Sequence, residues 1–422
     1  MASSITNSRI AQIVILSAMG LFVDGYDLFM MSIAMPIIMS DWHLQATSAG
    51  LIGAVAPIGA IIGAFSFGYF LDKFGRKKIM ILNMGLLSIF TLLTAFSPNV
   101  ETLVILRFLT GICIGADYPA SATYMSEMLP EKTKGRFMLC AFAFISLGAL
   151  ISALFGYFLL KEMPHNYTWH WLLFSSCIPT AIVFVLRFTL PESQLWLHNK
   201  YHQAKSMVKK VTFLHQYQEL FSKKYRGKLF FAATPWFLLD FSAYSLGFFM
   251  PVIFMQVFEQ TQHQTLIHES MMAAKSTAFS DIFNLIGIFI SFFIIDKFGR
   301  FKTQQIGFVG VVIAMVLLTI STFNTSTVAI IFVFAGFMLY NTSANAGPFP
   351  TTYIIAAEIF PTEIRGSAQG FSSSMAKLGA AIGTAALPFL SDNLGKSIAM
   401  GIMTGLMIVA LGITIYYKKH LD

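Results

Sequence analysis

Long apolar segments, separated by short polar ones, extend along the whole chain. Twelve of them are long enough for a helix to cross the hydrocarbon core of a bilayer, which takes about 20 residues. We therefore expect an all-α membrane protein with twelve transmembrane helices. The expected spans are 11–38, 48–71, 79–97, 101–126, 137–160, 169–190, 229–258, 273–295, 303–323, 327–356, 366–390 and 395–417.

One long polar segment interrupts this pattern after the sixth apolar run. Residues 191–228 are rich in lysine and separate six expected spans from six more. Basic segments beside membrane spans are typical of short amphipathic helices at the bilayer surface. We expect an N-terminal six-helix bundle at 1–190, a solvated cytoplasmic linker with interfacial helices at 191–228, and a C-terminal six-helix bundle at 229–422.

The composition supports a membrane protein rather than a soluble one. Hydrophobic residues make up 56% of the 422 residues, with 43 Phe and 23 Met, more than a water-soluble core would bury. The first apolar run contains two aspartates and lacks a small-residue cleavage site, so we interpret it as a retained span, not a signal peptide. The three cysteines lie inside expected spans without metal-ligand spacing, which is typical of packing residues.

The placement of charge predicts the topology. If the N-terminus is cytoplasmic, the 28 Lys and Arg residues lie on the cytoplasmic side with five exceptions, which are Arg107 and Lys377 within spans and Lys161, Lys275 and Lys396 outside. This asymmetry follows the positive-inside rule. The net charge of +8 therefore reflects membrane orientation, and we expect no nucleic-acid partner. An even number of spans places both termini in the cytoplasm.

Two motifs occur twice, at corresponding places in the two halves. The pentapeptide DKFGR occupies 72–76 and 296–300, at the end of the second span of each half, where Gly75 and Gly299 permit a tight turn. The pattern Glu-x-x-Pro-x-x-x-basic-Gly starts at Glu127 and again at Glu358. Basic loops that merely hold topology would explain the Lys and Arg residues but not the matched Asp, Gly, Glu and Pro. The repeats therefore predict one six-helix unit used twice.

These motifs resemble the signatures of the major facilitator superfamily. The resemblance rests on GYFLDKFGRKK, its echo FIIDKFGRFK, RFLTGICIG and the Glu-Pro-basic-Gly pair, and it covers nearly the whole chain. It implies two six-helix bundles that rock about a central cavity. It also implies ion-pair networks that close the cytoplasmic side, formed by Asp72, Arg76, Glu127 and Lys134 and by their counterparts Asp296, Arg300, Glu358 and Arg365.

Charged residues inside the first half are candidates for proton transfer, because charge within a membrane is costly and is seldom accidental. Asp24 and Arg107 fall at similar depths of spans one and four, so we expect them to be partners. A carboxylate that depends on a nearby guanidinium can carry a proton, and a permanent structural ion pair is the alternative. Asp27, about one turn further along, is the spare candidate.

The second half offers a candidate substrate site at mid-membrane depth. Asp240 and Lys377 each lie eleven residues inside the cytoplasmic ends of spans seven and eleven. Lys377 either neutralises Asp240 for packing or attracts an anionic substrate, and we favour the second because transporter sites lie between repeats at this depth. Trp236 and Tyr244 lie four residues to either side of Asp240, on its helical face. Asp281 and Asn284 of span eight reach a comparable depth and are weaker candidates.

Four further segments resemble the phosphate:proton symporter branch of the superfamily. They are FVDGYDLF, GADYPASATYMSE, PWFLLDFSAY and AKLGA. The resemblance implies that Asp24 and Asp117 handle protons and that the substrate cavity is lined by Tyr118, Trp236, Asp240, Tyr244 and Lys377. The chain departs from the branch at two positions, where Ile145 replaces a glutamine and Phe349 an asparagine. Because phosphate needs many donors to replace its water, we expect a small anion with some apolar surface.

The expected function is proton-coupled symport of a small anionic metabolite by alternating access. Inorganic phosphate:proton symport is the alternative, followed by a neutral sugar or polyol porter and by a transporter-like sensor; exchange and export are not separated from symport. No nucleophile, nucleotide loop or metal set is present in the sequence, so we expect no enzyme, cofactor or metal. The expected setting is a monomer in the cell membrane whose partners are protons, a small-molecule substrate and the bilayer.

Overall fold

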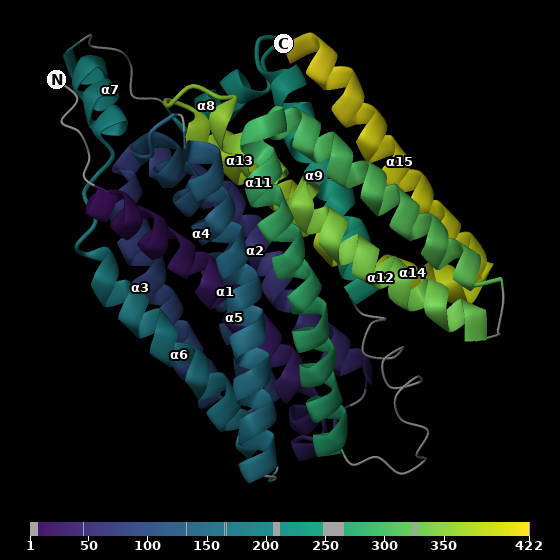
Figure 1. Ribbon diagram of the computed structural model, residues 1–422. Helices are drawn as coiled ribbons and strands as arrows, with labels where there is room; N and C mark the ends of the chain where they lie inside the picture. Colours follow the sequence, from purple (N-terminus) through teal and green to yellow (C-terminus); the bar gives the residue numbers. More distant parts are fainter. Residues whose placement is uncertain are drawn as a thin grey trace.

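The structure is a computed structural model that describes residues 7–44, 46–131, 133–163, 165, 167–205, 212–247, 266–323 and 327–421. All the regular elements in these ranges are helices, and Figure 1 shows them as long rods gathered into a bundle. They are α1 (Asn7–Asp41), α2 (Ala46–Phe74), α3 (Arg76–Ala95), α4 (Val100–Met128), α5 (Lys134–Glu162), α6 (Thr168–Arg187), α7 (Gln194–Lys205), α8 (Phe213–Leu220), α9 (Arg226–Gly247), α11 (Leu266–Ser321), α12 (Thr327–Ala346), α13 (Pro348–Glu358), α14 (Arg365–Leu394) and α15 (Lys396–Leu421).

These helices supply the twelve spans. Among the described residues, nine helical stretches are long and apolar enough to cross a membrane, and the one in α11 contains two of the expected spans. The remaining two spans, α4 and α14, are more polar because they carry the buried charges described below. For the seventh span, expected at 229–258, the structure describes α9 to Gly247, and positions 248–258 lie outside the described residues.

Glycine determines the helix break at each copy of the pentapeptide. Gly75 has φ 105° and Gly299 has φ 76°, so both occupy the left-handed region that the repeated pentapeptide was expected to require. Gly299 lies inside α11 and separates spans eight and nine. The tenth span also breaks, at Gly347, because Pro348 begins a new helix at a position where its missing N–H costs nothing. The residue pattern alone did not predict that break.

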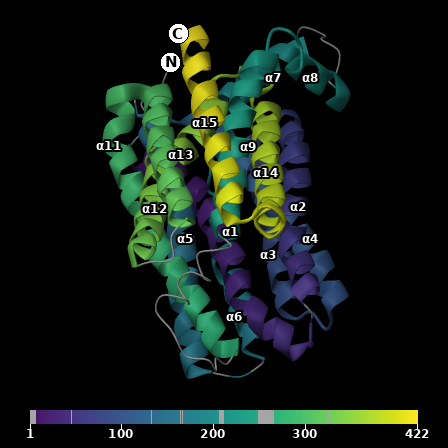
Figure 2. The same ribbon diagram turned by 90° about the vertical axis from the view of Figure 1, so that its right-hand side faces the viewer.

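The two halves repeat the same packing. In the first half α1 packs on α5, α2 on α4 and α3 on α6; in the second half α9 packs on α14, and α11 packs on α12 and α15. The start of α1 and the end of α15 lie on one face of the bundle, together with α7 and α8 (Figures 1 and 2). We call this face the terminal face. The duplication is confirmed by the repeated packing, whereas the boundaries at 190 and 228 stay a prediction.

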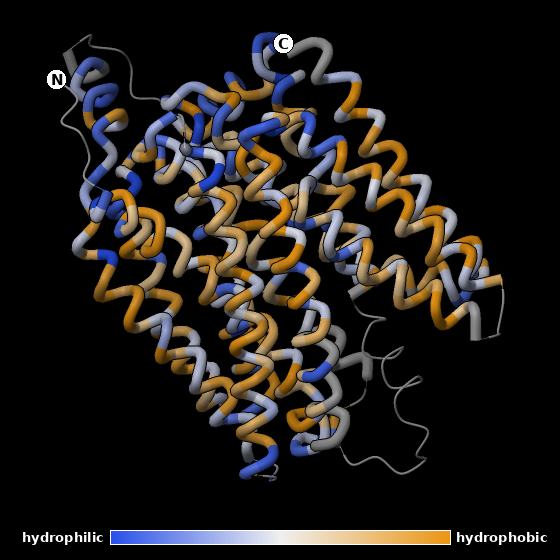
Figure 3. Tube along the Cα trace, viewed as in Figure 1, coloured by the Kyte–Doolittle hydropathy of each residue, from blue (hydrophilic) through white to orange (hydrophobic). Residues whose placement is uncertain are grey.

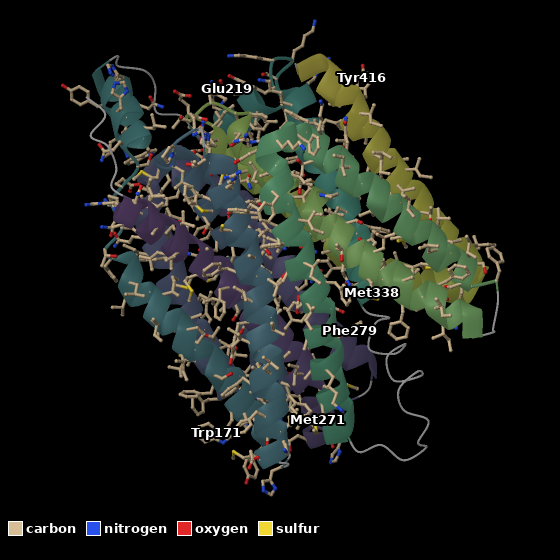
Figure 4. All side chains as sticks on the ribbon, viewed as in Figure 1. Trp171, Glu219, Met271, Phe279, Met338 and Tyr416 are labelled. Carbon is tan, nitrogen blue, oxygen red and sulfur yellow. The ribbon has the colours of Figure 1, made fainter. Side chains whose placement is uncertain are left out.

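Hydropathy follows this arrangement. Figure 3 shows hydrophobic positions along the middle of the rods and hydrophilic positions gathered at their ends, most densely at the terminal face. In Figure 4, Glu219 of α8 lies at the terminal face, and Trp171 lies toward the opposite end of α6 with half of its surface exposed. An exposed tryptophan near a helix end is typical of a membrane interface. The chain is therefore a multi-pass membrane protein.

The halves meet most closely where the second helix of one half crosses the fifth helix of the other. Thus α2 packs on α14, and the part of α11 before Gly299 packs on α5. The α2–α14 crossing is tight because glycines face one another there. A Cβ on Gly68 would lie 2.6 Å from the carbonyl oxygen of Gly366, and a Cβ on Gly370 would lie 2.4 Å from that of Ala64. This crossing lies at the terminal-face end of both helices.

Candidate functional site

Two arginines hold two of the three buried aspartates in the first half. Arg107 of α4 donates through Nη1 to Asp27 Oδ2 of α1 at 2.6 Å, and both side chains are buried. The expected pairing of Arg107 with Asp24 is therefore wrong, and the spare candidate takes its place. Counting residues gives depth along a helix, but the rotation and crossing of α1 and α4 decide which of two carboxylates one turn apart meets the guanidinium.

Asp117 of α4 is held by a residue that was not among the candidates predicted from the sequence. Arg187, the last residue of α6, donates to Asp117 Oδ1 at 2.6 Å and to Oδ2 at 3.1 Å, and to the Met80 carbonyl oxygen at 3.1 Å. Both members of this bidentate pair are fully buried. Gly20 of α1 makes the room, since a Cβ there would lie within 2.1 Å of both side chains. In the sequence, Arg187 is a single arginine at the end of an apolar segment. The positive-inside rule therefore assigned it to the cytoplasmic side and not to a buried site.

Asp24 differs from the other two aspartates. It is fully buried on α1, and within the described residues neither of its carboxylate oxygens has a hydrogen-bond partner. The charged groups that act on it electrostatically come from both halves of the protein and are Asp117, Lys377, Arg187 and Asp27. Asp24 is thus a buried carboxylate that no described residue holds by a hydrogen bond.

The five predicted substrate residues lie together where the halves meet. On α9, Trp236 hydrogen-bonds to the side chain of Asp240, and both are buried. Lys377 of α14 is also buried and interacts electrostatically with Asp240. Its Nζ lies 4.1 Å from the ring centroid of Tyr118 on α4 and 6.0 Å from that of Tyr244 on α9. Lys377 therefore faces the interior and contacts the other half, not lipid.

An aromatic cluster adjoins this site and links the two halves. Phe142 of α5 stacks on Phe349 at 6.4 Å and meets Tyr353 edge-on at 5.3 Å, and Tyr353 meets Trp236 edge-on at 6.3 Å. Phe349 is one of the two positions where the sequence departs from the phosphate symporter pattern. Phe349 is therefore part of an apolar wall. Through Phe142 and Tyr353 this wall extends to Trp236.

A second polar cluster lies on the seam between α11 and α12. Asn284 donates to Asp281 Oδ1 at 2.8 Å, and Asn345 donates to Asn284 Oδ1 at 2.8 Å. Asp281 Oδ2 is buried and has no partner among the described residues. Asp281 and Asn284 were weak candidates from depth alone, and Asn345 was missed because its partner lies on another helix.

The first copy of the pentapeptide fastens α2 to the opposite half. Asp72 accepts hydrogen bonds from the backbone N–H of Gly366 at 3.0 Å and of Ser367 at 2.8 Å, and from the Ser367 hydroxyl at 2.9 Å. These groups form the N-terminus of α14, where backbone N–H groups and the helix dipole favour an anion. Arg76 forms two hydrogen bonds with Glu127, at 3.0 and 2.8 Å, and donates to the Thr362 carbonyl oxygen at 3.0 Å.

The second copy makes the corresponding contacts, with differences. Arg300 pairs with Glu358 at 3.1 Å, as Arg76 does with Glu127. Asp296 pairs with Arg136 at the start of α5, the position that corresponds to Ser367 in α14. The side chain of Asp296 is more exposed than that of its counterpart: 27% of its surface is exposed, against 4% for Asp72. The remaining two candidates pair differently: Arg365 reaches Glu127 at 3.5 Å, whereas Lys134 pairs with its neighbour Glu131.

Helices α7 and α8 contact this network directly. Gln216 of α8 donates to Asp72 Oδ2 at 2.7 Å and to the Glu363 carbonyl oxygen at 3.2 Å, and so bridges the halves. Trp196 of α7 donates to the Asp72 carbonyl oxygen at 2.8 Å. The expectation of a solvated linker is therefore wrong for α8, whose Gln216, Tyr217 and Leu220 are buried. Burial raises the pKa of the Tyr217 phenol, which donates to the Phe65 carbonyl oxygen at 2.6 Å.

The difference between the two Asp contacts predicts unequal effects of the same substitution. Asp72 accepts three hydrogen bonds from α14 through its two carboxylate oxygens. Asp72→Asn replaces one of these oxygens by an NH2 donor that faces other donors, and should cost about 1–3 kcal/mol of stability. Asp296→Asn, the matched change at the exposed pair, should cost about 0–1 kcal/mol. The measurement is thermal unfolding followed with a thiol-reactive dye, because Cys113 is buried and becomes reactive on unfolding. Equal shifts in the two variants would contradict the prediction.

Comparison with known proteins places this geometry in a family. Residues 13–419 match the family model described as "Sugar (and other) transporter". The chain is 29% identical to a putative inorganic phosphate transporter 1-13 of Oryza sativa subsp. japonica, over 88% of this chain and 81% of that protein. It is also 29% identical to a probable inorganic phosphate transporter 1-6 of Arabidopsis thaliana, over 95% of this chain and 90% of that protein.

Solved structures share the fold. The proton:xylose symporter XylE, a member of the major facilitator superfamily, superimposes with a TM-score of 0.80 at 22% identity, covering 97% of this chain and 96% of that one. The fucose:proton symporter FucP of E. coli gives a TM-score of 0.73 at 18% identity, covering 96% and 98%. The chain therefore belongs to the sugar (and other) transporter family and has the major facilitator fold, so it is a membrane transporter and not an enzyme.

Proposed function

We propose that this protein is a symporter that moves a small anion together with protons across the cell membrane by alternating access. The terminal face is cytoplasmic in this proposal, in agreement with the concentration of Lys and Arg there, and the working unit is a monomer. The observation that carries the proposal is the position of Asp24. It is a buried carboxylate with no hydrogen-bond partner in the described part of the chain, and it shares an electrostatic environment with Lys377 of the opposite half.

The coupling follows from the charges around Asp24. Lys377 stabilises the ionised form of Asp24, and Asp117 and Asp27 oppose it. An anion that binds beside Lys377 neutralises this stabilisation, so a proton then binds to Asp24 more readily. By thermodynamic linkage, a protonated Asp24 favours the anion equally. Proton and anion therefore enter and leave together, while Arg107 and Arg187 keep Asp27 and Asp117 in fixed pairs.

Opening toward the cytoplasm requires the halves to separate at the terminal face. The contacts that must break include those of Asp72 with the start of α14, of Asp296 with Arg136, and of Arg365 with Glu127. The hydrogen bond from Arg76 to the Thr362 carbonyl oxygen and the bridge made by Gln216 also cross between the halves. Ion pairs and helix-end contacts near water form and break at modest cost. The Arg76–Glu127 and Arg300–Glu358 pairs lie within one half each, so they move with their halves and keep both contact surfaces intact.

The substrate we favour is an organic anion with an apolar part, such as a small carboxylate. Lys377, Tyr118 and Trp236 offer a cation and donors for an anionic group, and the aromatic cluster of Phe142, Phe349 and Tyr353 offers an apolar surface beside them. Inorganic phosphate is the second candidate, and the names of the two plant relatives favour it. A neutral sugar would leave Lys377 without a charged ligand. A sensor would have no need of the contacts that the two pentapeptide copies make between the halves.

Uptake into proteoliposomes under an imposed proton gradient tests the proposal. The panel contains phosphate, aromatic and aliphatic carboxylates, sugars and polyols, each with and without the gradient. We expect gradient-dependent accumulation of a carboxylate. Accumulation of phosphate alone would replace the favoured substrate with the second candidate, and uptake of neutral sugars alone would exclude an anion site at Lys377.

Asp24→Asn tests the proton route separately. An asparagine keeps the shape of the side chain but binds no proton, so accumulation against a gradient should fall to equilibration while exchange of internal for external substrate continues. The rate of exchange should also lose its dependence on pH. The control is Asp392→Asn, at an exposed position near the end of α14. Continued accumulation by the Asp24 variant would exclude this residue as the proton carrier.

A further inference from the structure

A cavity of about 470 Å³ lies outside the transport site, where the turn between α2 and α3 meets α7. Three lysines line it, Lys77 and Lys78 from the start of α3 and Lys200 from α7. Its remaining walls are largely apolar and include Phe74, Ile81 and Leu197. The cavity thus combines a cluster of cations with hydrocarbon surface at the terminal face of the protein.

An apolar groove of about 500 Å³ continues from this cavity along the outside of the bundle. The two share Lys78 and Ile81, and the groove lies between α3 and α6, where Leu82 and Ile89 line it from α3 and Phe188 from the end of α6. Leu82, Ile89 and Phe188 are each about half exposed on this side of the helices, as expected for side chains that face lipid. The groove therefore runs from the membrane surface into the hydrocarbon region.

The described residues do not balance the charges in the cavity. Among them, Glu192 is the one carboxylate that lines it, and Glu192 Oε1 already accepts the backbone N–H groups of Arg76 at 2.9 Å and Lys77 at 3.1 Å at the start of α3. Burial and repulsion by Lys78 lower the pKa of Lys200. Cations that repel one another are stabilised by an added anion. The cavity is therefore suited to an anionic ligand of the membrane surface.

We propose that the cavity and groove together bind an anionic phospholipid of the cytoplasmic leaflet. Its phosphate and headgroup lie among Lys77, Lys78 and Lys200, and one acyl chain lies in the groove between α3 and α6. Basic pockets at the cytoplasmic ends of membrane helices recognise anionic headgroups in this way, and each nearby lysine adds to the attraction. The apolar continuation favours a lipid over free phosphate, which would leave the groove unused.

The position of the lipid gives it a connection to the terminal-face contacts. Lys200 donates to the Lys73 carbonyl oxygen at 2.9 Å, and Trp196 of the same helix donates to the Asp72 carbonyl oxygen at 2.8 Å. A lipid held between Lys200 and the start of α3 therefore fixes α7 against the turn that presents Asp72 to α14. Bound lipid should stabilise the arrangement in which the terminal face is closed.

Native mass spectrometry of the purified full-length protein tests the site. The probes are phosphatidylglycerol and phosphatidylcholine of the same chain length, each titrated against the delipidated protein. We expect one phosphatidylglycerol to bind with higher affinity than phosphatidylcholine, and Lys78→Gln/Lys200→Gln to weaken it on the order of tenfold. The matched control is Lys297→Gln/Lys302→Gln, which removes two exposed lysines from the corresponding place in the second half.

Shape and headgroup are separated by two further measurements. Leu82→Trp fills the groove without changing charge, and should weaken phosphatidylglycerol binding while the protein keeps its unfolding temperature. Inorganic phosphate at millimolar concentration should not displace the lipid. Equal loss in the two lysine variants, equal binding of the two lipids, or displacement by phosphate would overturn the proposal. All of these outcomes are independent of which substrate the transporter carries.

Discussion

Replacing Lys377 with glutamine should reduce substrate uptake on the order of 100-fold while leaving the protein folded. The lysine is buried, faces the ring of Tyr118 across the junction of the halves and interacts electrostatically with Asp240. Removing one partner of a desolvated charge contact costs about 2–5 kcal/mol, and about 2.7 kcal/mol corresponds to a 100-fold change in binding. The measurement is initial uptake of the substrate identified by the panel, at several concentrations.

Two variants distinguish a substrate contact from a packing contact. Lys396→Gln is the control, because Lys396 is an exposed lysine at the start of α15 and should leave uptake unchanged. Asp240→Asn/Lys377→Gln removes both charges at once. If Lys377 merely neutralised Asp240, this double variant would recover uptake. We expect it to remain inactive, because the cation that attracts the anion is still missing.

Asp117→Ala should destabilise the protein by about 3–5 kcal/mol, which is the cost of leaving one member of a buried ion pair alone. Arg187 has no exposed surface, so its charge cannot be satisfied by water when the carboxylate is removed. Glu131→Ala is the matched control: Glu131 pairs with Lys134 but is 87% exposed, and its loss should cost about 0–1 kcal/mol. Thermal unfolding of both variants in the same detergent measures the difference.

The charge and the shape of this pair are separated by a second substitution. Asp117→Ala/Arg187→Met removes both charges and fills the space of the arginine with an apolar side chain. Replacing a buried ion pair by apolar residues is often neutral, so this variant should regain much of the lost stability. A double variant as unstable as Asp117→Ala would mean that the pair contributes by its hydrogen bonds to α3 and α1, not by its balance of charge.

The paired arginines also explain why the proposal assigns the proton to Asp24. Three aspartates of the first half were candidates from sequence, with Asp27 as the spare. Asp27 and Asp117 each hold a guanidinium at 2.6 Å in a fixed pair. Asp24 has no such partner among the described residues. The choice of Asp24 as proton carrier therefore rests on which side chains meet in the structure. The same contacts show that Arg107 pairs with Asp27 and not, as expected, with Asp24.

The span pattern, the turn glycines and the duplicated halves were readable from the chain itself. A bilayer requires each span to be apolar over a set length, and a left-handed turn favours glycine. Each of these features can therefore be predicted from the residues of one segment alone. The gathering of Trp236, Asp240, Tyr244 and Lys377 was also predictable, because their depth and helical face follow from local spacing.

Contacts between segments could not be predicted in this way. Arg187 with Asp117, Asn345 with Asn284, and Gln216 with Asp72 each join side chains that lie 61 or more residues apart on different helices. Whether they meet depends on the rotation and crossing angle of packed helices, which are set by interactions such as the glycine contact of α2 with α14. The residue pattern along one helix predicts how deep a side chain lies in the membrane and which helical face it occupies. Which partner a buried charge contacts depends on the packing of the whole bundle.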